Sequence, residues 1–236
     1  MKKFYIAPEV IDIFPQIKIG VLVCNGINNH IEAENKYARY LIEAQEEAGK
    51  YISNPQFTEN PVVAGWREAF RQFPTKKGAR CSIEAMLKRV FNDGSIGTIN
   101  PLVDLYNGVS LRYGVPVGGE DIDQFEGDMR LAVADGEEYF VTYGSDKSEP
   151  PRVGEVIYKD DGGAVCRCFN WRESVRTMLT EDTTNAFMII ESVGGAGTEN
   201  VEDAIAELKK LIEENLGGTV EQYIVTAEAP EIIIEK

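Results

Sequence analysis

The chain has 236 residues, of which 43% are hydrophobic, so it is long enough to bury the core of one compact unit. Its 24 basic and 39 acidic side chains give a formal net charge of -15, which repels polyanions at long range and argues against a general nucleic-acid binder. No segment approaches the ~20 apolar residues of a membrane span, and we expect a soluble, cytoplasmic protein without a membrane or DNA partner. Any RNA contact has to be local.

A single histidine, His30, argues against most histidine-dependent hydrolytic mechanisms and most zinc sites. The four cysteines, Cys24, Cys81, Cys166 and Cys168, are scattered, and the Cys-Arg-Cys spacing at 166–168 fits neither a zinc knuckle nor a redox pair. We therefore expect no metal and no cofactor. Catalysis, if present, would be metal-independent and would use water, carboxylates, amides and backbone groups.

The first hundred residues are expected to be mainly helical after a short hairpin. Apolar alternation predicts a strand at 17–23, paired with residues 9–14 across Pro15-Gln16. Helices are expected from Asn29 to Asn54-Pro55, over 62–73, over 82–91 with Ser82 as the N-cap, and from Asn100 with Pro101 in the first turn.

Strands dominate after Gly127. They are expected at 129–134, 138–143, 155–158, 164–169, 186–192 and 219–227, with one amphipathic helix at 201–216 that ends at Gly217-Gly218. Helices cluster first and strands follow. This order predicts an α+β fold, with helices packed on a mostly antiparallel or mixed sheet, rather than a doubly wound sheet.

A polar stripe follows the helix that starts at Asn100. Asn100, Asp104 and Asn107 are three to four residues apart and share one helix face. If this face is buried, its amides and carboxylate need partners in the protein or in a ligand. The alternative is a stripe that faces solvent.

Two glycines follow the same helix. Gly118 and Gly119 precede Glu120 and Asp121, and glycines at positive φ can direct backbone N–H groups at a ligand oxygen. A plain turn is the alternative. Without a GxGxxG or P-loop pattern, the segment predicts no nucleotide site.

The segment 166–173 runs from a strand into polar residues interleaved with aromatics. Alternation places Asn170 and Arg172 on one face, and Phe169, Trp171 and Glu173 on the other. Asparagine and arginine are good donors to a carbonyl or carboxylate, and tryptophan can stack on a ring.

Residues 64–89 carry seven basic and two acidic side chains, a local excess of positive charge in an acidic chain. The candidate RNA-binding cations of this window are Arg67, Arg71, Lys76, Lys77 and Arg80. The alternative is a solvated helix face, which is the usual role of charged helix surfaces.

In combination, five runs resemble the editing module of the phenylalanyl-tRNA synthetase beta subunit, the B3/B4 domain, in its stand-alone form. The runs are PTKKGARCSIEAMLKR, INPLVDLYNGVSLRYGVPVGGEDID, GDMRLAVADGEEYF, GEVIYKDDGGAVCRCFNWRES and TEDTTNAF. They extend over about half of the chain, from about Phe73 to Val193. The resemblance implies one B3/B4-like domain over residues 1–236, with residues 1–60 as a strand-helix N-terminal extension.

The resemblance also implies a pocket between sheet and helices that hydrolyses tyrosine wrongly attached to the phenylalanine tRNA. The glutamate that reads the tyrosine hydroxyl in the synthetase falls near Glu173. A family histidine is replaced at about Gly118, and a glycine-rich run is replaced by Cys168-Phe169-Asn170-Trp171-Arg172. We therefore expect the pocket to be kept and leave the identity of its ligand open.

We expect Asn170, Arg172 and Glu173 to be catalytic and Asn100, Asp104, Asn107, Gly118, Gly119 and Asp121 to bind substrate in the same cavity. Hydrogen-bond donors would stabilise an oxyanion, and we expect them to be the Gly118 and Gly119 amides, Asn170 and Arg172. Glu173 or Asp121 would orient water or the substrate ammonium. Three hypotheses remain: an aminoacyl-tRNA hydrolase acting in trans, a binder or hydrolase of a free small amino-acid derivative, and a non-catalytic regulatory module. The chain is too short to be the synthetase itself.

Overall fold

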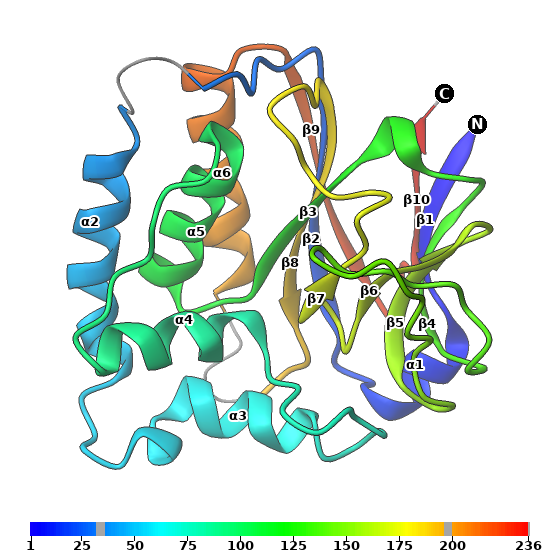
Figure 1. The fold of residues 1–236 in the computed structure, drawn as a ribbon, viewed down its shortest axis with the longest axis horizontal. Coiled ribbons are helices and arrows are strands. Elements are labelled where there is room, and N and C mark those ends of the chain that lie inside the picture. The colour runs from blue at the N-terminus through cyan, green and yellow to red at the C-terminus, as the bar shows by residue number, and fades with distance from the viewer. Residues whose placement is uncertain (32–35, 196–199, 236) are drawn as a thin grey trace.

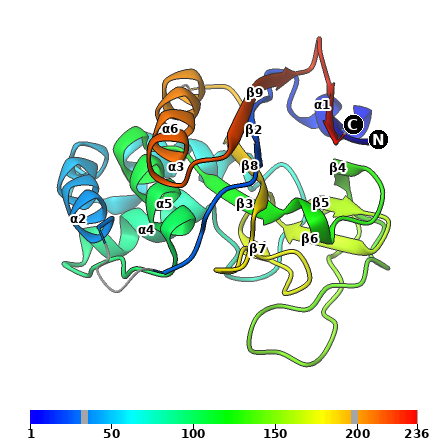
Figure 2. The same cartoon turned by 90° about the horizontal axis from the view of Figure 1, so that it is seen from above.

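A computed structural model describes residues 1–31, 36–195 and 200–235 of the chain. Two β-sheets face each other, and helices cover the outer face of one of them (Figures 1 and 2). The predicted α+β class is confirmed. Within the described part of the chain, no helix has the length and apolar character needed to cross a membrane.

The first sheet has four antiparallel strands in the order β3-β8-β2-β9. Their bounds are β3 Val117–Asp121, β8 Asn185–Ser192, β2 Lys18–Asn25 and β9 Thr219–Thr226. Helices α5 (Pro101–Tyr113) and α6 (Val201–Asn215) pack on its outer face, and α2 (Ala38–Glu47) packs on α5. Gly20 permits the close approach of α6, because a Cβ there would lie 2.9 Å from Val201 Cγ1.

The second sheet has six strands in the order β10-β1-β4-β5-β6-β7. Its strands are β10 Glu231–Glu235, β1 Lys2–Ile6, β4 Met129–Val133, β5 Val156–Asp160, β6 Gly163–Arg167 and β7 Arg172–Glu173. β1 and β4 are parallel, and the other neighbours are antiparallel. The main core lies between the two sheets, where Phe4 of β1 contacts Phe187 of β8 with ring centroids 5.2 Å apart.

Short helices close the molecule around the sheets. They are α1 Pro8–Ile13, η1 Ala48–Tyr51, η2 Phe57–Glu59, α3 Pro61–Ala69, α4 Ser82–Phe91 and η3 Ile122–Gln124. Helices α3 and α4 lie side by side below α5 in Figure 1. Their position beside the end of β7 brings residues 64–89, which we call the basic window, next to the segment 166–173.

The predicted N-terminal hairpin is wrong. Residues 9–14 belong mostly to helix α1, which Pro8 opens and in which Val10 is buried. Proline is favourable in the first turn of a helix, since its missing N–H would have no partner there. The strand β2 instead lies inside a sheet, between β8 and β9.

The predicted strand at 138–143 is also wrong, since these residues form a loop. The Glu138 carboxylate accepts hydrogen bonds from the backbone of Asp135 and Gly136 and from Lys159. These side-chain bonds hold an irregular backbone that apolar alternation alone does not reveal.

The helix expected from Asn29 starts later, at Ala38, while part of the expected range, residues 32–35, lies outside the described residues. The predicted cap and first-turn proline of α5 are confirmed, because the Asn100 side chain accepts a hydrogen bond from Val103 N and Pro101 opens the helix. Ser82 is the first residue of α4 and not its N-cap.

Candidate functional site

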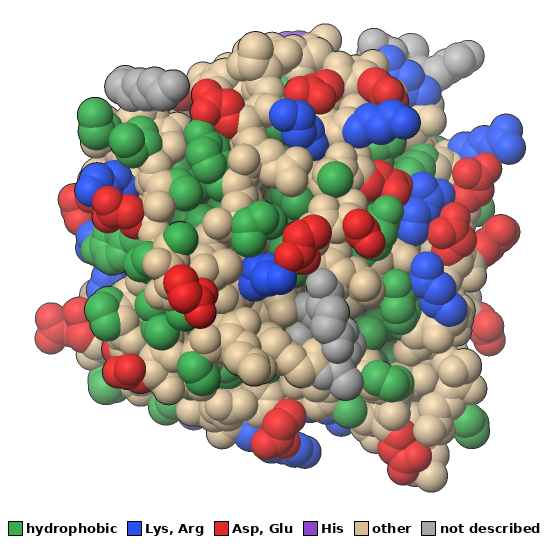
Figure 3. Space-filling model, turned by 180° about the vertical axis from the view of Figure 1, so that it is seen from behind, with side chains coloured by type: hydrophobic (Ala, Val, Ile, Leu, Met, Phe, Trp, Pro, Cys, Tyr) green, Lys and Arg blue, Asp and Glu red, His purple; other side chains and the backbone are tan. Residues whose placement is uncertain are grey.

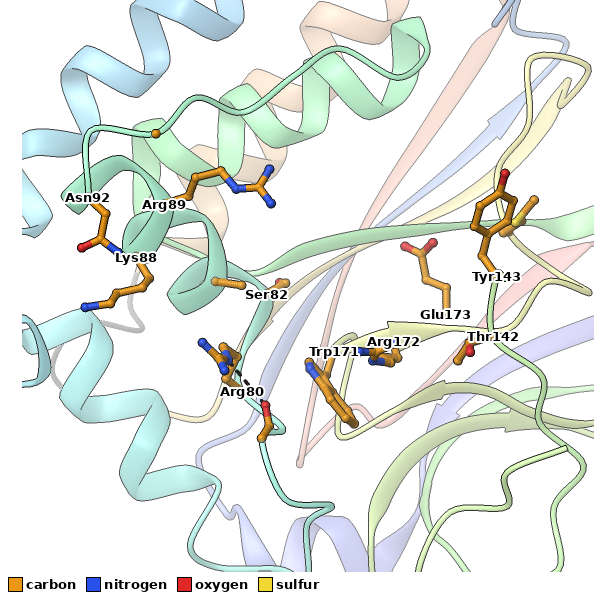
Figure 4. Close-up of a pocket in the computed structure, with 14 residues that line it drawn as sticks. Arg80, Ser82, Lys88, Arg89, Asn92, Thr142, Tyr143, Trp171, Arg172 and Glu173 are labelled. Carbon is orange, nitrogen blue, oxygen red and sulfur yellow. Dashed lines mark hydrogen bonds between the residues drawn. The ribbon is translucent and has the colours of Figure 1, made fainter. Parts of the chain in front are cut away.

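A hollow of about 780 Å³ lies between α4, β7 and the segment 142–143 (Figure 4). It is lined by Gly78, Arg80, Ser82, Ala85, Lys88, Arg89, Asn92, Gly94, Thr142, Tyr143, Trp171, Arg172, Glu173 and Met178. We call it the main hollow. Its size and its few converging polar groups are typical of a small-molecule site.

The β6–β7 turn carries backbone strain. Cys168 and Phe169 have φ values of 47° and 57°, which residues other than glycine rarely adopt. Phe169 is fully buried among four rings, those of Phe14, Trp66, Phe70 and Phe73. This burial offsets the strain, and the turn thereby presents residues 170–173 to the main hollow.

Glu173 is the acidic group of the main hollow. Its neighbour across the β6–β7 ladder is Cys166, and its carboxylate points into the space opposite α4 (Figure 4). Burial raises the pKa of Glu173 to about 7. Its protonation therefore changes near neutral pH, which suits a group that orients water or a substrate amine.

More acids lie behind Glu173. The buried Glu120 carboxylate accepts a hydrogen bond from Cys166 Sγ at 2.8 Å, and its Oε2 has no hydrogen-bond partner within the described chain. Burial and the nearby Glu173 hold the pKa of Glu120 well above its ordinary value. Burial raises the pKa of Glu191 to about 8. A raised pKa favours the neutral form of these carboxyls, which avoids the cost of burying charge.

Arg89 faces Glu173 across the main hollow. Figure 4 shows the two side chains extending from α4 and from β7 toward the same space. A Cβ at Gly94 would lie 2.8 Å from Arg89 Cγ, so the glycine that follows α4 leaves room for this arginine. Arg89 forms no ion pair within the described chain, and its charge is free for a ligand.

Arg89 was not among the residues expected in the site. Ser82, Ala85 and Arg89 all line the main hollow and lie at helical spacing along α4. This face of α4 was the available signal, although the sequence alone did not say which face would be turned to a ligand.

Two of the expected catalytic residues, Arg172 and Glu173, line the main hollow. Asn170 lies just behind them, and its Oδ1 accepts a hydrogen bond from Ser82 Oγ at 2.8 Å. A Cβ at Gly118 would lie 3.0 Å from Asn170 Nδ2, so this asparagine occupies the space that a larger residue at position 118 would need. Asn170 therefore connects β3, α4 and the β6–β7 turn.

The expected glycine nest does not form. Gly118 and Gly119 belong to the extended strand β3, which pairs with β8, and neither has a positive φ. The absent Cβ of Gly119 matters for packing, since a Cβ there would lie 2.5 Å from Met188 Sδ. Asp121 accepts a hydrogen bond from Thr183 Oγ1 at 2.8 Å and stabilises the end of β3.

The polar residues of α5 make hydrogen bonds within the protein, at the start of the helix. Asn100 Oδ1 accepts hydrogen bonds from Val103 N and from Asn29 Nδ2, and Asp104 Oδ1 accepts one from Ile99 N. Asn107 is half-buried. None of Asn100, Asp104 and Asn107 lines the main hollow.

The basic window is partly neutralised within the fold. Arg67 pairs with Glu84 at 2.7 Å, Arg71 pairs with Glu68 at 2.7 Å, and Lys76 pairs with Glu149. Arg80 lines the main hollow, while Lys77 lines a smaller hollow beside it. On the face shown in Figure 3, acidic and basic side chains are intermixed.

The four cysteines are buried and unpaired. Burial raises the pKa of Cys166, with the neighbouring Glu120 and Glu173 adding to the effect, so its thiol is a poor nucleophile. Among the residues that the structure describes, no group of three or more histidine, cysteine, aspartate or glutamate side chains is placed to hold a metal ion.

An N-terminal fragment of the phenylalanyl-tRNA synthetase beta subunit from Pyrococcus horikoshii is a structural neighbour, with a TM-score of 0.48 and 11% sequence identity. The alignment covers 94% of this chain and 53% of that one, so the chain spans about half the length of its neighbour. A search of curated proteins found no match. The model of the B3/4 domain matches residues 65–215, which is more than half of the chain. The chain therefore belongs to the B3/4 domain family.

Proposed function

We propose that the main hollow receives the aminoacyl end of a mischarged tRNA and that the chain hydrolyses its ester in trans. One observation carries the proposal: Glu173 lines the main hollow together with three arginines, Arg80, Arg89 and Arg172, in a chain of net charge -15. Arg80 and Arg172 are suited to the anionic backbone of the RNA, and Glu173 and Arg89 are suited to the polar aminoacyl end.

An aminoacyl ester is an activated substrate, so the protein needs chiefly to place water and stabilise an oxyanion. Ionised Glu173 orients the water and accepts its proton as the oxygen attacks the ester carbonyl. Arg89 donates hydrogen bonds to the oxyanion. The ester C–O bond then breaks, the ribose oxygen takes the proton, and the products are the free amino acid and the uncharged tRNA.

Asn170 acts in this proposal as a positioning residue. Its hydrogen bond to Ser82 ties the β6–β7 turn to the start of α4. The two elements carry Glu173 and Arg89 respectively. The Asn170–Ser82 bond therefore sets the separation between the carboxylate and the guanidinium.

The test is a deacylation assay with a panel of purified aminoacyl-tRNAs, in the presence of a chelator. We expect hydrolysis of one or a few of them, reduced by about 100-fold in Glu173→Gln and in Arg89→Gln. Arg39→Gln on α2 is the matched control, because Arg39 is exposed and pairs with Glu43 away from the site. Absence of deacylation across the whole panel would contradict the proposal.

A second candidate is hydrolysis or binding of a free small amino-acid derivative. The ion pairs of Arg67, Arg71 and Lys76 favour it, because the charge of three of the five expected RNA-binding cations is offset by a neighbouring carboxylate. Amino-acid methyl esters in the same assay separate the two candidates. Turnover of the small esters without turnover of any aminoacyl-tRNA would select the second.

A further inference from the structure

A ridge separates the main hollow from a smaller one. Trp171 and Arg172 line both the main hollow and a neighbouring hollow of about 320 Å³, which we call the side hollow. Gly78 and Thr142 are also common to the two. A ligand that extends beyond the main hollow in this direction therefore crosses the boundary that these four residues form.

The side hollow carries uncommitted positive charge. Lys77 and Arg172 line it, and neither forms an ion pair within the described chain. The other cations there have partners: Arg167 is buried and bonds both carboxylate oxygens of Glu155 at 2.8 Å, and Lys76 pairs with Glu149. Lys77 and Arg172 are thus the cations of the side hollow that are left for a ligand.

Trp171 is a half-buried indole at the edge of both hollows. Its backbone N–H donates to Arg167 O and Cys168 O at 3.2 Å, which ties it to the strained β6–β7 turn. The Arg172 guanidinium lies over its ring, 5.0 Å from the ring centroid. An aromatic side chain with cations beside it is the arrangement by which proteins bind single-stranded nucleic acid, with bases on the ring and phosphates on the cations.

We propose that this ridge holds the single-stranded 3′ end of the RNA, with a base taking the place of Arg172 over the Trp171 ring, and with the displaced Arg172 and Lys77 binding backbone phosphates. The inference rests on the proposed function for the identity of the RNA, since the aminoacyl end would enter the main hollow while the preceding nucleotides cross the ridge. It adds the path of the strand, which the main hollow alone does not define. Double-stranded RNA does not fit this mode because its bases are not free to stack on a side chain.

The test uses a fluorescently labelled single-stranded RNA that ends in CCA and carries no amino acid, with Kd measured by fluorescence anisotropy over a range of salt concentrations. Trp171→Ala is expected to weaken binding by about 5- to 150-fold, and Trp171→Phe to retain most of the affinity. Arg172→Gln and Lys77→Gln are each expected to lower the slope of log K against log salt by about 0.7. Arg39→Gln is the control and should bind like the wild type.

Equal binding by wild type and Trp171→Ala, or by the single strand and a blunt RNA duplex of the same length, would overturn the ridge proposal. Since Trp171→Phe keeps an aromatic ring, recovery of binding in this variant excludes general unfolding as the cause of the loss in Trp171→Ala. The two proposals fail separately. RNA binding without deacylation supports the ridge and contradicts hydrolysis, whereas ester hydrolysis without RNA binding contradicts the ridge.

Discussion

Two polar regions of this chain look alike in the sequence and differ in the fold. At the start of α5, Asn29, Asn100 and Asp104 are buried and hydrogen-bonded to the protein. At the β6–β7 turn, Arg172 and Glu173 project into the main hollow, and Arg172 has no ion-pair partner within the described chain. The first region stabilises the fold, and the second has groups left over for a ligand. Polar clusters are thus better assigned by whether the protein satisfies them than by their composition.

Glu173→Gln should have the largest effect and should affect function only. Deacylation is expected to fall by about 100-fold, because the amide cannot accept a proton from water. The midpoint of urea unfolding should not fall, since no protein group depends on the ionised carboxylate and the neutral amide avoids the cost of burying a charge. Glu43→Gln is a matched control on exposed α2. A large loss of stability in Glu173→Gln would erase the distinction between the two regions.

Asn100→Ala should show the reverse pattern. The variant loses the cap of α5 and one partner of Asn29, which should lower the free energy of unfolding by about 2 kcal/mol. Asn107→Ala on the same helix should change it by less than about 0.5 kcal/mol, since that residue is half-buried. Urea denaturation measures both. If the two variants proved equally stable, the structural role assigned to Asn100 would be incorrect.

The acids behind the main hollow make stability depend on pH. Glu173 and Glu191 have folded-state pKa values raised to about 7 and about 8, so the folded protein binds more protons than the unfolded chain. Their contribution is fully present below the ordinary pKa of 4.5 and is lost as pH rises from there through about 7 for Glu173 and about 8 for Glu191. Within that window each group can lower the free energy of unfolding by up to about 1.4 kcal/mol per pH unit, and above it the loss is complete. Glu191→Gln should reduce the decline of the free energy of unfolding with pH, measured by urea denaturation at pH values from 5 to 9. An unchanged decline would contradict the role assigned to Glu191.

The smallest expected effect is the difference in RNA binding between variants of an ion-paired cation and of a cation without an ion-pair partner in the described chain. Arg71→Gln should change the Kd for the single-stranded RNA by less than about twofold, because Glu68 already neutralises this side chain. Arg80→Gln should lower the salt slope by about 0.7, because Arg80 lines the main hollow and has no ion-pair partner within the described chain. Equal effects of the two variants in anisotropy titrations would show that the internal ion pairs do not decide RNA contact.

Local signals predicted the elements with strong, independent patterns. Asn100 and Pro101 marked the start of α5, and apolar periodicity located α6 and β8. The misses differ in cause. In β3, backbone conformation depends on partners that are distant in sequence, the β8 residues that pair with Gly118 and Gly119. In α1 the cause is the proline that opens the helix, and at 138–143 it is hydrogen bonding of the Glu138 carboxylate to nearby backbone, and apolar alternation reveals neither.

The five motif runs of the sequence indicated the family, and the order of its helix and strand patterns indicated the α+β class. Both can be read along the chain without knowledge of tertiary contacts. They also placed Arg172 and Glu173 in the candidate site. Only the tertiary structure decided that Arg89 faces Glu173, that Gly118 makes room for Asn170 and that three cations of the basic window are internally paired. The physical reason is that a charge or a hydrogen-bonding group is available to a ligand only when no other part of the protein satisfies it, and that depends on contacts between residues far apart in the chain.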